Sequence, residues 1–347
     1  MNYLVIPAYE PDYNLIKLIE KIHHRSNFYI IVIDDGSSAE CQDIFARAED
    51  FATVLHHQGN QGKGQALKTA FEDIQSLNKP GTVVTADADG QHRIWDIFRS
   101  LTKSNENPNT LVLGVRAFTG KVPLRSRFGN SLTRILFKLQ TGVAVSDTQT
   151  GLRAFSTDMI PFMLKIEGQR YEYEMNMLLE SSQAYPILEV PIETVYINDN
   201  QASHFRPIRD GLMIYKNILK FALSSFSSFI VDYVVYALSI LCLSFIPTGL
   251  RVLLSNGLAR VTSSIFNFST NKKLVFKNKA SSLKTGSGYF GLAIGLFILD
   301  TILIRLFNSG LGVDLLIAKI LVGIMLFILS WTVQTRFIFK ERTCSPL

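Results

Sequence analysis

The sequence has few cysteines, and those it has are widely separated. Among its 347 residues the three cysteines, Cys41, Cys242 and Cys344, form no Cys-x-x-Cys pair. Neither a disulfide framework nor a zinc site is indicated. Intrinsic disorder is also excluded, because 24 Phe, 12 Tyr and a net charge of only +6 leave ample apolar surface to bury.

Acidic residues are scarce in the C-terminal part of the chain. Up to Tyr215 there are 21 Lys and Arg against 25 Asp and Glu, a net charge of −4, whereas the remainder has 14 basic and 4 acidic residues, a net charge of +10. The remainder is also very apolar. A basic, apolar segment suits a membrane surface better than DNA, so no nucleic-acid partner is expected.

Four apolar stretches in this remainder are each near the roughly 20 residues that cross a bilayer as a helix. They are Phe221–Ile246, Val252–Phe268, Tyr289–Phe307 and Leu315–Phe339. Five lysines and no acid lie between the second and third stretches, and the positive-inside tendency places that loop in the cytoplasm. Four crossings then place both termini there. The apolar run Tyr3–Pro7 is too short for a signal peptide.

These features predict an integral membrane protein of the cell membrane with two domains. Residues 1–215 form a cytosolic domain, and residues 216–347 form an all-α domain of four transmembrane helices. In the first domain, short apolar runs alternate with amphipathic stretches, which predicts an α/β fold with a mostly parallel, doubly wound sheet. The predicted strands are Tyr3–Ile6, Tyr29–Ile33, Thr53–Leu55 and Thr82–Ala86.

Polar clusters follow three of these strands. They are Pro7-Ala8-Tyr9-Glu10, Asp34-Asp35-Gly36-Ser37 and Asp87-Ala88-Asp89-Gly90-Gln91-His92. Because ligands of doubly wound sheets bind beyond the carboxyl ends of the strands, the three clusters are expected to converge on one pocket.

Asp87 and Asp89 form an Asp-x-Asp pair just past the fourth strand. Two carboxylates at this spacing face the same side of an extended segment, and with Gln91 they suit Mg²⁺ or Mn²⁺ bridging to a diphosphate. The alternative is a simple turn with Asx hydrogen bonds. The neighbouring clusters favour the metal site, with His92 beside the ligands or purely structural.

Other polar segments carry structural alternatives. The Asp34-Asp35 segment can hold a base or ribose, or can be a strand-to-helix turn. The glycine-rich stretch around Lys63 resembles a phosphate-binding loop, but it lacks the P-loop spacing and can equally begin a helix. Arginines of the later part suit phosphates as a group, although each alone can be a solvated surface charge. They are Arg116, Arg125, Arg127, Arg153, Arg206 and Arg209.

Five motifs in order carry a family resemblance. They are Ile6-Pro7-Ala8-Tyr9, Ile33-Asp34-Asp35-Gly36-Ser37, Asn60-Gln61-Gly62-Lys63-Gly64, Asp87-Ala88-Asp89-Gly90-Gln91-His92 and Asp147-Thr148-Gln149-Thr150-Gly151-Leu152-Arg153-Ala154-Phe155. With them the chain resembles the family 2 glycosyltransferases that build polyprenyl- or dolichyl-phosphate sugars. The resemblance implies a Rossmann-like GT-A fold, an inverting mechanism, a UDP- or GDP-linked sugar donor held by a divalent metal, and a polyprenyl phosphate acceptor.

The resemblance also implies roles for single residues. It assigns Asp87, Asp89 and Gln91 to the metal, with Asp89 essential to catalysis. Asp147 is the family position considered for a general base, and it can instead orient an arginine or the sugar. The substrate-binding candidates, including Asp35 and Lys63 from the clusters above, are Pro7, Tyr9, Glu10, Asp34, Asp35, Lys63, Arg116, Arg127 and Arg206.

The C-terminal part carries a second resemblance. Phe266-Asn267-Phe268, followed by Asn271-Lys272-Lys273-Leu274-Val275-Phe276, resembles the small GtrA-like four-helix membrane proteins, which are proposed to help lipid-linked sugars cross the bilayer. Charged residues in these helices are either functional or paired with one another, and Arg260 is the candidate for meeting a lipid phosphate. They are Asp232, Arg260, Asp300, Arg305 and Lys319. Small residues over Gly286–Gly295 offer a surface for self-association.

Two other functions are weighed against this one. A transporter of lipid-linked sugars would use the membrane part as its main actor and the first domain as a sensor or inactive relic, but the intact metal and arginine motifs disfavour it. A processive polysaccharide synthase would carry a Gln-x-x-Arg-Trp motif, whereas Trp95 and Trp331 follow Ile94 and Ser330. The sequence leaves open which sugar is used.

Overall fold

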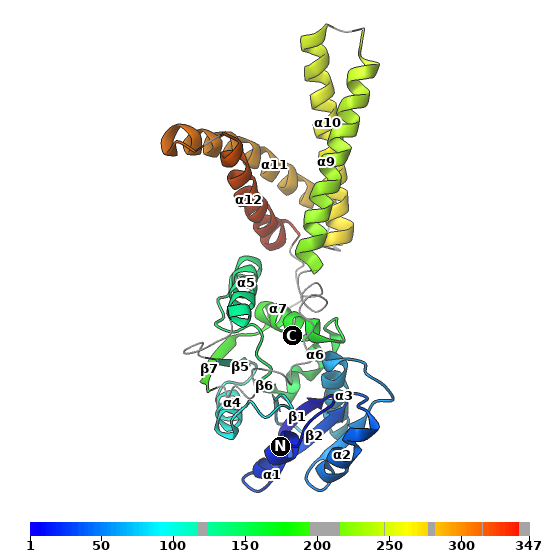
Figure 1. The fold of residues 1–347 in the computed structure, drawn as a ribbon, viewed down its shortest axis with the longest axis vertical. Helices are drawn as coiled ribbons and strands as arrows, with labels where there is room; N and C mark the ends of the chain where they lie inside the picture. Colours follow the sequence, from blue (N-terminus) through cyan, green and yellow to red (C-terminus); the bar gives the residue numbers. More distant parts are fainter. Residues whose placement is uncertain (117–123, 194–215, 246, 277–281, 314, 340–347) are drawn as a thin grey trace. The chain divides into compact units, whose positions relative to one another are not determined.

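A computed structural model describes residues 1–116, 124–193, 216–245, 247–276, 282–313 and 315–339. These residues belong to two compact units, one ending at residue 193 and one beginning at residue 216 (Figure 1). Each unit is described by itself.

The N-terminal unit is an α/β domain, as the alternating sequence pattern predicts. Its strands are β1 (Asn2–Ala8), β2 (Phe28–Asp34), β3 (Thr53–His56), β4 (Thr82–Thr85), β5 (Leu111–Arg116), β6 (Arg153–Ser156) and β7 (Ile187–Ile192). Its α-helices are α1 (Asn14–His23), α2 (Gln42–Ala48), α3 (Lys63–Leu77), α4 (Ile94–Glu106), α5 (Leu124–Thr141), α6 (Ile160–Lys165) and α7 (Tyr171–Ala184). Two 3₁₀ turns, Ala39–Cys41 and Thr157–Met159, precede α2 and α6.

One seven-stranded sheet in the order β3-β2-β1-β4-β6-β5-β7 organises this unit. Strand β6 is antiparallel to both neighbours, and the other strands pair in parallel. Because β6 runs backwards, its first residue, Arg153, pairs with Thr85 at the carboxyl end of β4. The segment leading into β6 is thereby brought to the edge where the parallel strands end.

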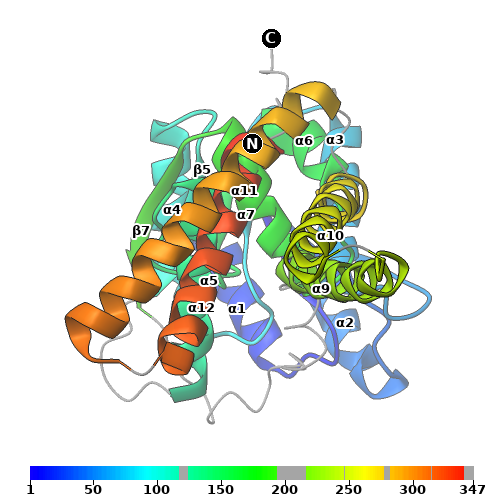
Figure 2. The ribbon, with the colours of Figure 1, turned by 90° about the horizontal axis from the view of Figure 1, so that it is seen from above.

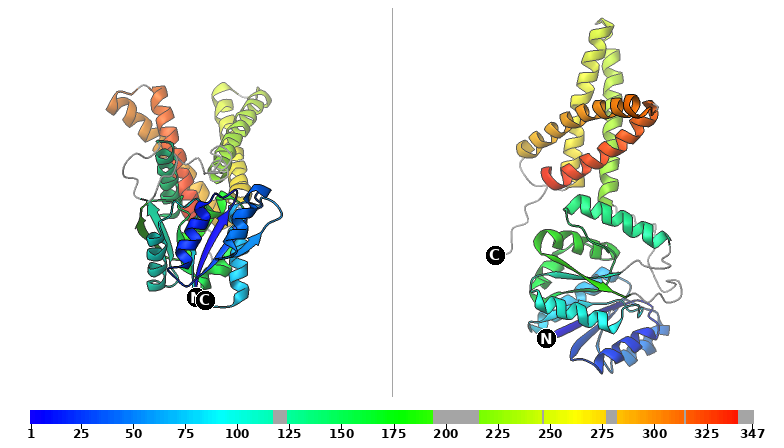
Figure 3. Two further views of the ribbon diagram at one scale, coloured as in Figure 1. Left: turned by 60° about the horizontal axis from the view of Figure 1, so that its bottom comes forward. Right: turned by 90° about the vertical axis from the view of Figure 1, so that its left-hand side faces the viewer.

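The hydrophobic core lies on both faces of the sheet. Alternate residues of a strand point to opposite faces, so Val5 and Leu4 of β1 belong to different core clusters. The cluster of Val5 packs against α3, α6 and α7, and the cluster of Leu4 packs against α1, α2 and α4. Figure 3 shows helices on both sides of the sheet. Near-continuous burial along β1 and β2 explains why their sequences are apolar throughout.

The C-terminal unit is helical. Its α-helices are α9 (Lys216–Cys242), α10 (Thr248–Thr270), α11 (Ser282–Arg305) and α12 (Leu315–Val333), with π-helical turns Asn271–Val275, Leu306–Gly310 and Gln334–Ile338. Helices α9 and α10 run side by side, as do α11 and α12 (Figure 2). Two segments within the described residues, Leu219–Ser239 and Leu321–Ile338, are long and apolar enough to cross a membrane. Four crossings therefore stay a prediction.

A polar network joins the helices of this unit. The Asn267 side chain of α10 donates to Ser228 Oγ of α9 at 2.8 Å and accepts from Tyr289 of α11 at 2.7 Å. Asn271 donates to Asn267 at 2.9 Å and to Gln334 at 3.0 Å. Such hydrogen bonds hold helices together where water is absent.

Of the membrane charges singled out in the sequence, Asp232 is described with its contacts. It accepts a hydrogen bond from Ser263 at 2.9 Å. The side chains of the other four, Arg260, Asp300, Arg305 and Lys319, lie outside the described residues.

Candidate active site

The ends of β1 and β2 are tied together by polar contacts. The Asp35 N–H donates to the Ala8 carbonyl at 2.8 Å. Glu10, which has a left-handed backbone (φ 49°), accepts from the Ser38 N–H at 2.7 Å and from the Ser38 hydroxyl at 2.9 Å. Its own N–H donates to Ser37 Oγ at 3.0 Å. The first two polar clusters of the sequence therefore form one structure at this sheet edge.

Asp35 holds the glycine-rich loop. Its carboxylate accepts the N–H groups of Gln61 at 2.9 Å and Gly62 at 2.8 Å, and one oxygen lies 2.8 Å from Nδ1 of His57. Asp35 is buried. Both oxygens are thus bonded to the protein, which gives Asp35 a structural task, and its contact with substrate stays a prediction.

Asp34 closes the end of β2. Its Oδ1 accepts the Ser37 N–H at 2.8 Å, and its Oδ2 lies 2.9 Å from Nδ1 of His56. Burial by itself would raise the pKa of Asp34, but the hydrogen bonds from Ser37 and His56 outweigh it and lower that pKa. Pro7, at the end of β1, is buried, and Tyr9 is exposed beside this cluster.

Gly36 lies where the β2 turn meets the glycine-rich loop. Its φ is +74°, and a Cβ there would lie 2.3 Å from the Gly59 carbonyl carbon and 2.6 Å from the Asn60 nitrogen. We expect Gly36→Ala to lower the free energy of unfolding by roughly 2 kcal/mol or more, because backbone strain and overpacking add. Urea unfolding measures this change. Gly59→Ala is the matched control, since a Cβ at Gly59 meets no atom within 4 Å; equal loss in both variants would contradict the prediction.

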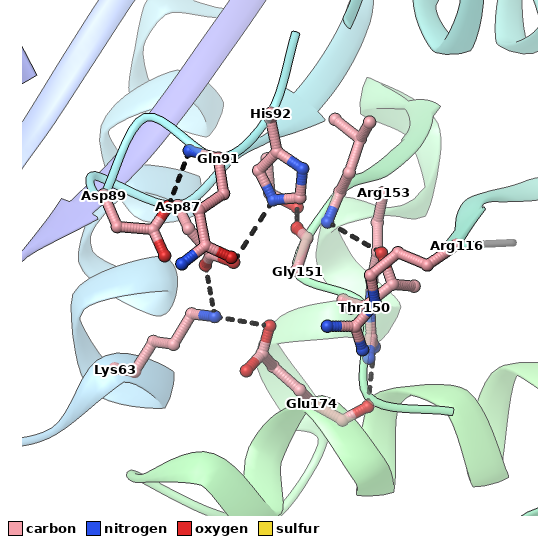
Figure 4. A network of polar contacts seen from close by, with 12 residues as sticks. Lys63, Asp87, Asp89, Gln91, His92, Arg116, Thr150, Gly151, Arg153 and Glu174 are labelled. Atoms are coloured by element: carbon pink, nitrogen blue, oxygen red, sulfur yellow. Dashed lines mark hydrogen bonds and ion pairs between the residues drawn. The ribbon is translucent and has the colours of Figure 1, made fainter. Parts of the chain in front are cut away.

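The glycine-rich loop delivers Lys63 to the Asp-x-Asp segment. Gly62 adopts φ +103° immediately before α3 begins at Lys63. The Lys63 ammonium lies 2.6 Å from Asp87 Oδ1 and 2.9 Å from Glu174 Oε1 (Figure 4). The sequence leaves open whether this loop binds phosphate or only begins a helix. The structure shows that it also positions the Lys63 ammonium beside Asp87.

The surroundings of Asp87 and Asp89 shift the pKa values of the two carboxyl groups in opposite directions. Asp87 contacts Lys63 through one oxygen, and its other oxygen lies 3.2 Å from Nε2 of His92. Burial opposes ionisation of Asp87, but Lys63 and His92 hold its pKa well below the usual range. Asp89 accepts the Gln91 N–H at 3.0 Å, and burial followed by the charge of Asp87 raises the pKa of Asp89.

These residues fit a divalent cation that binds carboxylates of the protein and can also contact substrate phosphates. Within the described residues no three His, Cys, Asp or Glu side chains are grouped to hold a metal ion. Mg²⁺ is usually held by one or two carboxylates together with substrate phosphates, and Asp87, Asp89 and Gln91 supply hard oxygen donors. Asp89 is the better placed carboxylate, because both Asp87 oxygens already contact cationic or donor groups.

The segment before β6 supplies the other side of the site. Asp147 is fully buried and accepts from Arg116 Nε at 2.6 Å and Nη2 at 3.1 Å. The Gln149 N–H donates to the same carboxylate at 3.0 Å. Of the roles considered for Asp147, this geometry favours orientation of an arginine over a base.

The segment before β6 also lies close to Asp87. A Cβ at Gly151 would lie 2.5 Å from both Asp87 oxygens, so glycine is needed for this approach. The Gly151 carbonyl accepts from Thr85 Oγ1 at 2.8 Å. Arg153 is buried and donates to the Thr150 carbonyl at 3.1 Å.

Most of the predicted site residues meet at one sheet edge. The structure links Lys63 to the Asp-x-Asp segment and Arg116 to Asp147. Arg127 lies on α5 with its side chain outside the described part of the chain, and Arg206 lies outside it altogether. Glu174 was missed, because a glutamate in the first turn of α7 has the same local signal as Glu172 two residues earlier.

Comparisons with known proteins match both units. Residues 3–160 match the model of Glycosyl transferase family 2, and residues 220–339 match that of the GtrA/DPMS transmembrane domain. The chain is 28% identical over 221 residues to a UDP-N-acetylglucosamine--dolichyl-phosphate N-acetylglucosaminyltransferase of Methanococcus voltae, covering 58% of this chain and 88% of the relative. It is 26% identical over 205 residues to a polyprenol monophosphomannose synthase of Mycolicibacterium smegmatis, covering 54% and 75%.

A solved structure shows a weaker likeness. Glucosyl-3-phosphoglycerate synthase from Mycobacterium tuberculosis, solved in complex with Mn²⁺, UDP and phosphoglyceric acid, aligns with a TM-score of 0.47 at 18% identity. The alignment covers 63% of this chain and 76% of that one.

Proposed function

Because the chain joins a glycosyltransferase family 2 domain to a GtrA/DPMS transmembrane domain, we propose that it transfers a sugar from a nucleotide sugar to polyprenyl phosphate. The product, a polyprenyl-phosphate sugar, would serve cell-envelope glycan synthesis. The proposed donor is a UDP- or GDP-linked hexose. The N-terminal unit and both termini would be cytoplasmic, with four helices in the membrane.

One observation carries this proposal: Asp89, which accepts the Gln91 N–H, lies beside Asp87, which pairs with Lys63, so two carboxylates meet at the carboxyl edge of the sheet. The relatives named above support the acceptor class, since the name of one specifies transfer to dolichyl phosphate and the name of the other specifies a polyprenol monophosphomannose product. The membrane unit would anchor the chain in the bilayer that also holds a lipid substrate.

The proposed sugar transfer does not need a strong general base. A phosphate oxygen of the acceptor attacks the anomeric carbon, the bond from that carbon to the nucleoside diphosphate oxygen breaks, and the configuration inverts. The second pKa of a phosphate monoester is about 6, so most acceptor is already a dianion at neutral pH. A bound divalent cation would neutralise charge on the departing diphosphate.

The residues of this chain would orient and neutralise the substrates. Asp89 and Gln91 would hold the cation, Lys63 would contribute positive charge beside it, and Arg116, held by Asp147, would bind a phosphate through its guanidinium group.

We expect transfer of radiolabelled sugar to polyprenyl phosphate in detergent from one member of a panel of UDP- and GDP-sugars. Mg²⁺ or Mn²⁺ should support this transfer, and EDTA should reduce it at least about a hundredfold, because charge on the leaving diphosphate is then left uncompensated. Extraction of the labelled lipid measures the product. Protein heated beyond unfolding is the control for non-enzymatic transfer.

The same experiment separates the alternatives. Folded protein that gives no product with any donor would contradict the proposed transfer and favour the transporter interpretation. Full transfer in EDTA would contradict the proposed metal while leaving the transferase in place.

A further inference from the structure

Lys63 is shared between two carboxylates that come from different elements. Its ammonium lies 2.6 Å from Asp87, after β4, and 2.9 Å from Glu174, on α7. The side chains of Lys63 and Glu174 are only 19% and 13% exposed. Charges so far from bulk water interact more strongly than surface pairs, so this shared contact matters electrostatically.

Glu174 is itself held firmly in place. Its main-chain carbonyl accepts a hydrogen bond from the buried Arg153 guanidinium at 2.6 Å. The neighbouring Tyr173 is buried and donates from its hydroxyl to the Met163 carbonyl at 2.9 Å. Figure 4 shows the Lys63 ammonium between the carboxylates of Asp87 and Glu174, with a contact to each. Glu174 is therefore a fixed anionic partner for a long, flexible lysine side chain.

The charges of this cluster do not cancel. Lys63 contributes one positive charge and the nearby Arg153 guanidinium a second, whereas Asp87, Glu174 and Asp89 contribute three negative ones. If Glu174 were neutral, the ammonium would pair with Asp87 alone and cancel its charge. If Glu174 stays charged, the ammonium interacts with both carboxylates. A larger net negative charge then remains at Asp87 and Asp89.

We propose that Glu174 is a positioning residue that divides the charge of Lys63 and so preserves the attraction of the Asp87–Asp89 segment for a divalent cation. The proposal deepens the proposed function and rests on it for the reaction served. The binding of a cation is a separate property, and it can be measured without turnover.

The test measures binding of Mn²⁺ alone to the full-length protein in detergent, from the loss of the free Mn²⁺ signal in electron paramagnetic resonance. Omitting nucleotide removes any contact between Lys63 and phosphate from the result. We expect Glu174→Gln to weaken binding about tenfold, because a unit charge near the ion is lost while the shape is kept. Lys63→Gln should tighten binding, and the double variant should return to within about threefold of the unchanged protein.

The matched control is Glu180→Gln, which removes the same charge from an exposed position of α7. Its Mn²⁺ affinity should stay within about twofold of that of the unchanged protein, because exposed charges at a distance are screened. Thermal unfolding of each variant checks the fold. If Glu174→Gln does not fold, Lys63→Gln still tests the proposal, because that variant should tighten Mn²⁺ binding rather than weaken it.

Two results would overturn the inference. One is equal Mn²⁺ affinity of Glu174→Gln and Glu180→Gln. The other is weaker Mn²⁺ binding in Lys63→Gln. Lys63 would then favour binding of the ion, and Glu174 would have no opposing charge to offset. The expected binding pattern in a protein without sugar transfer would instead contradict the proposed function and leave the role of Glu174 standing.

Discussion

Asp89→Asn should lower the rate of sugar transfer at least about a hundredfold while leaving the fold intact. The substitution removes the negative charge that would hold the cation, and loss of one preorganised charge-stabilising group typically costs this much. The hydrogen bond that the Asp89 side chain accepts from the Gln91 N–H can be kept by the asparagine oxygen. Initial rates at saturating Mg²⁺ or Mn²⁺, with thermal unfolding of the same preparations, test both parts.

Asp43→Asn is the control for this experiment. Asp43 lies exposed in the first turn of α2, and the same charge is removed there. Its transfer rate should equal that of the unchanged protein. Near-normal turnover of Asp89→Asn would contradict the assignment of the metal site, and unfolding of that variant would contradict the expectation that the fold stays intact.

Asp147→Asn should lower kcat/KM about a hundredfold, because the Arg116 guanidinium would lose the carboxylate that orients it. Arg116 donates to both Asp147 oxygens, at 2.6 and 3.1 Å. An amide can accept at one of these positions only, so the guanidinium would shift. Displacement of a substrate-positioning group by about 1 Å can cost this factor. Steady-state kinetics with varied acceptor measure the loss.

A double-mutant cycle with Arg116→Ala tells the two roles of Asp147 apart. If Asp147 acts through Arg116, the double variant should be no slower than the worse single variant, because both changes remove one interaction. Additive losses would show that Asp147 acts on its own, as a base would. Glu106→Gln, which breaks the exposed pair with Lys103, is the control, and it should change kcat/KM little.

Several features could be predicted from local patterns. The apolar runs that became β1 and β2 could be recognised directly, since a buried parallel strand is apolar throughout. The Asp-x-Asp segment follows β4, as its place after an apolar run predicts. The four C-terminal helices were predicted from hydropathy alone, with α9, α10 and α11 each beginning before the apolar stretch does.

Other features required the fold. Nothing in Arg153–Ser156 itself indicates that β6 runs antiparallel between β4 and β5, yet that pairing brings Gly151 against Asp87 and Asp147 to Arg116. Strand order depends on contacts between distant segments, which no window of sequence contains.

The sequence by itself therefore determined the α/β class, the helical C-terminal unit and the residue types of the site, because periodicity, hydropathy and short motifs are local. The tertiary structure decided the tasks of individual carboxylates. Asp35 binds loop N–H groups, Asp147 binds an arginine, and Asp89 accepts the Gln91 N–H beside Asp87. A carboxylate is the same group in each place, and only its neighbours in space make it a structural anchor or a ligand.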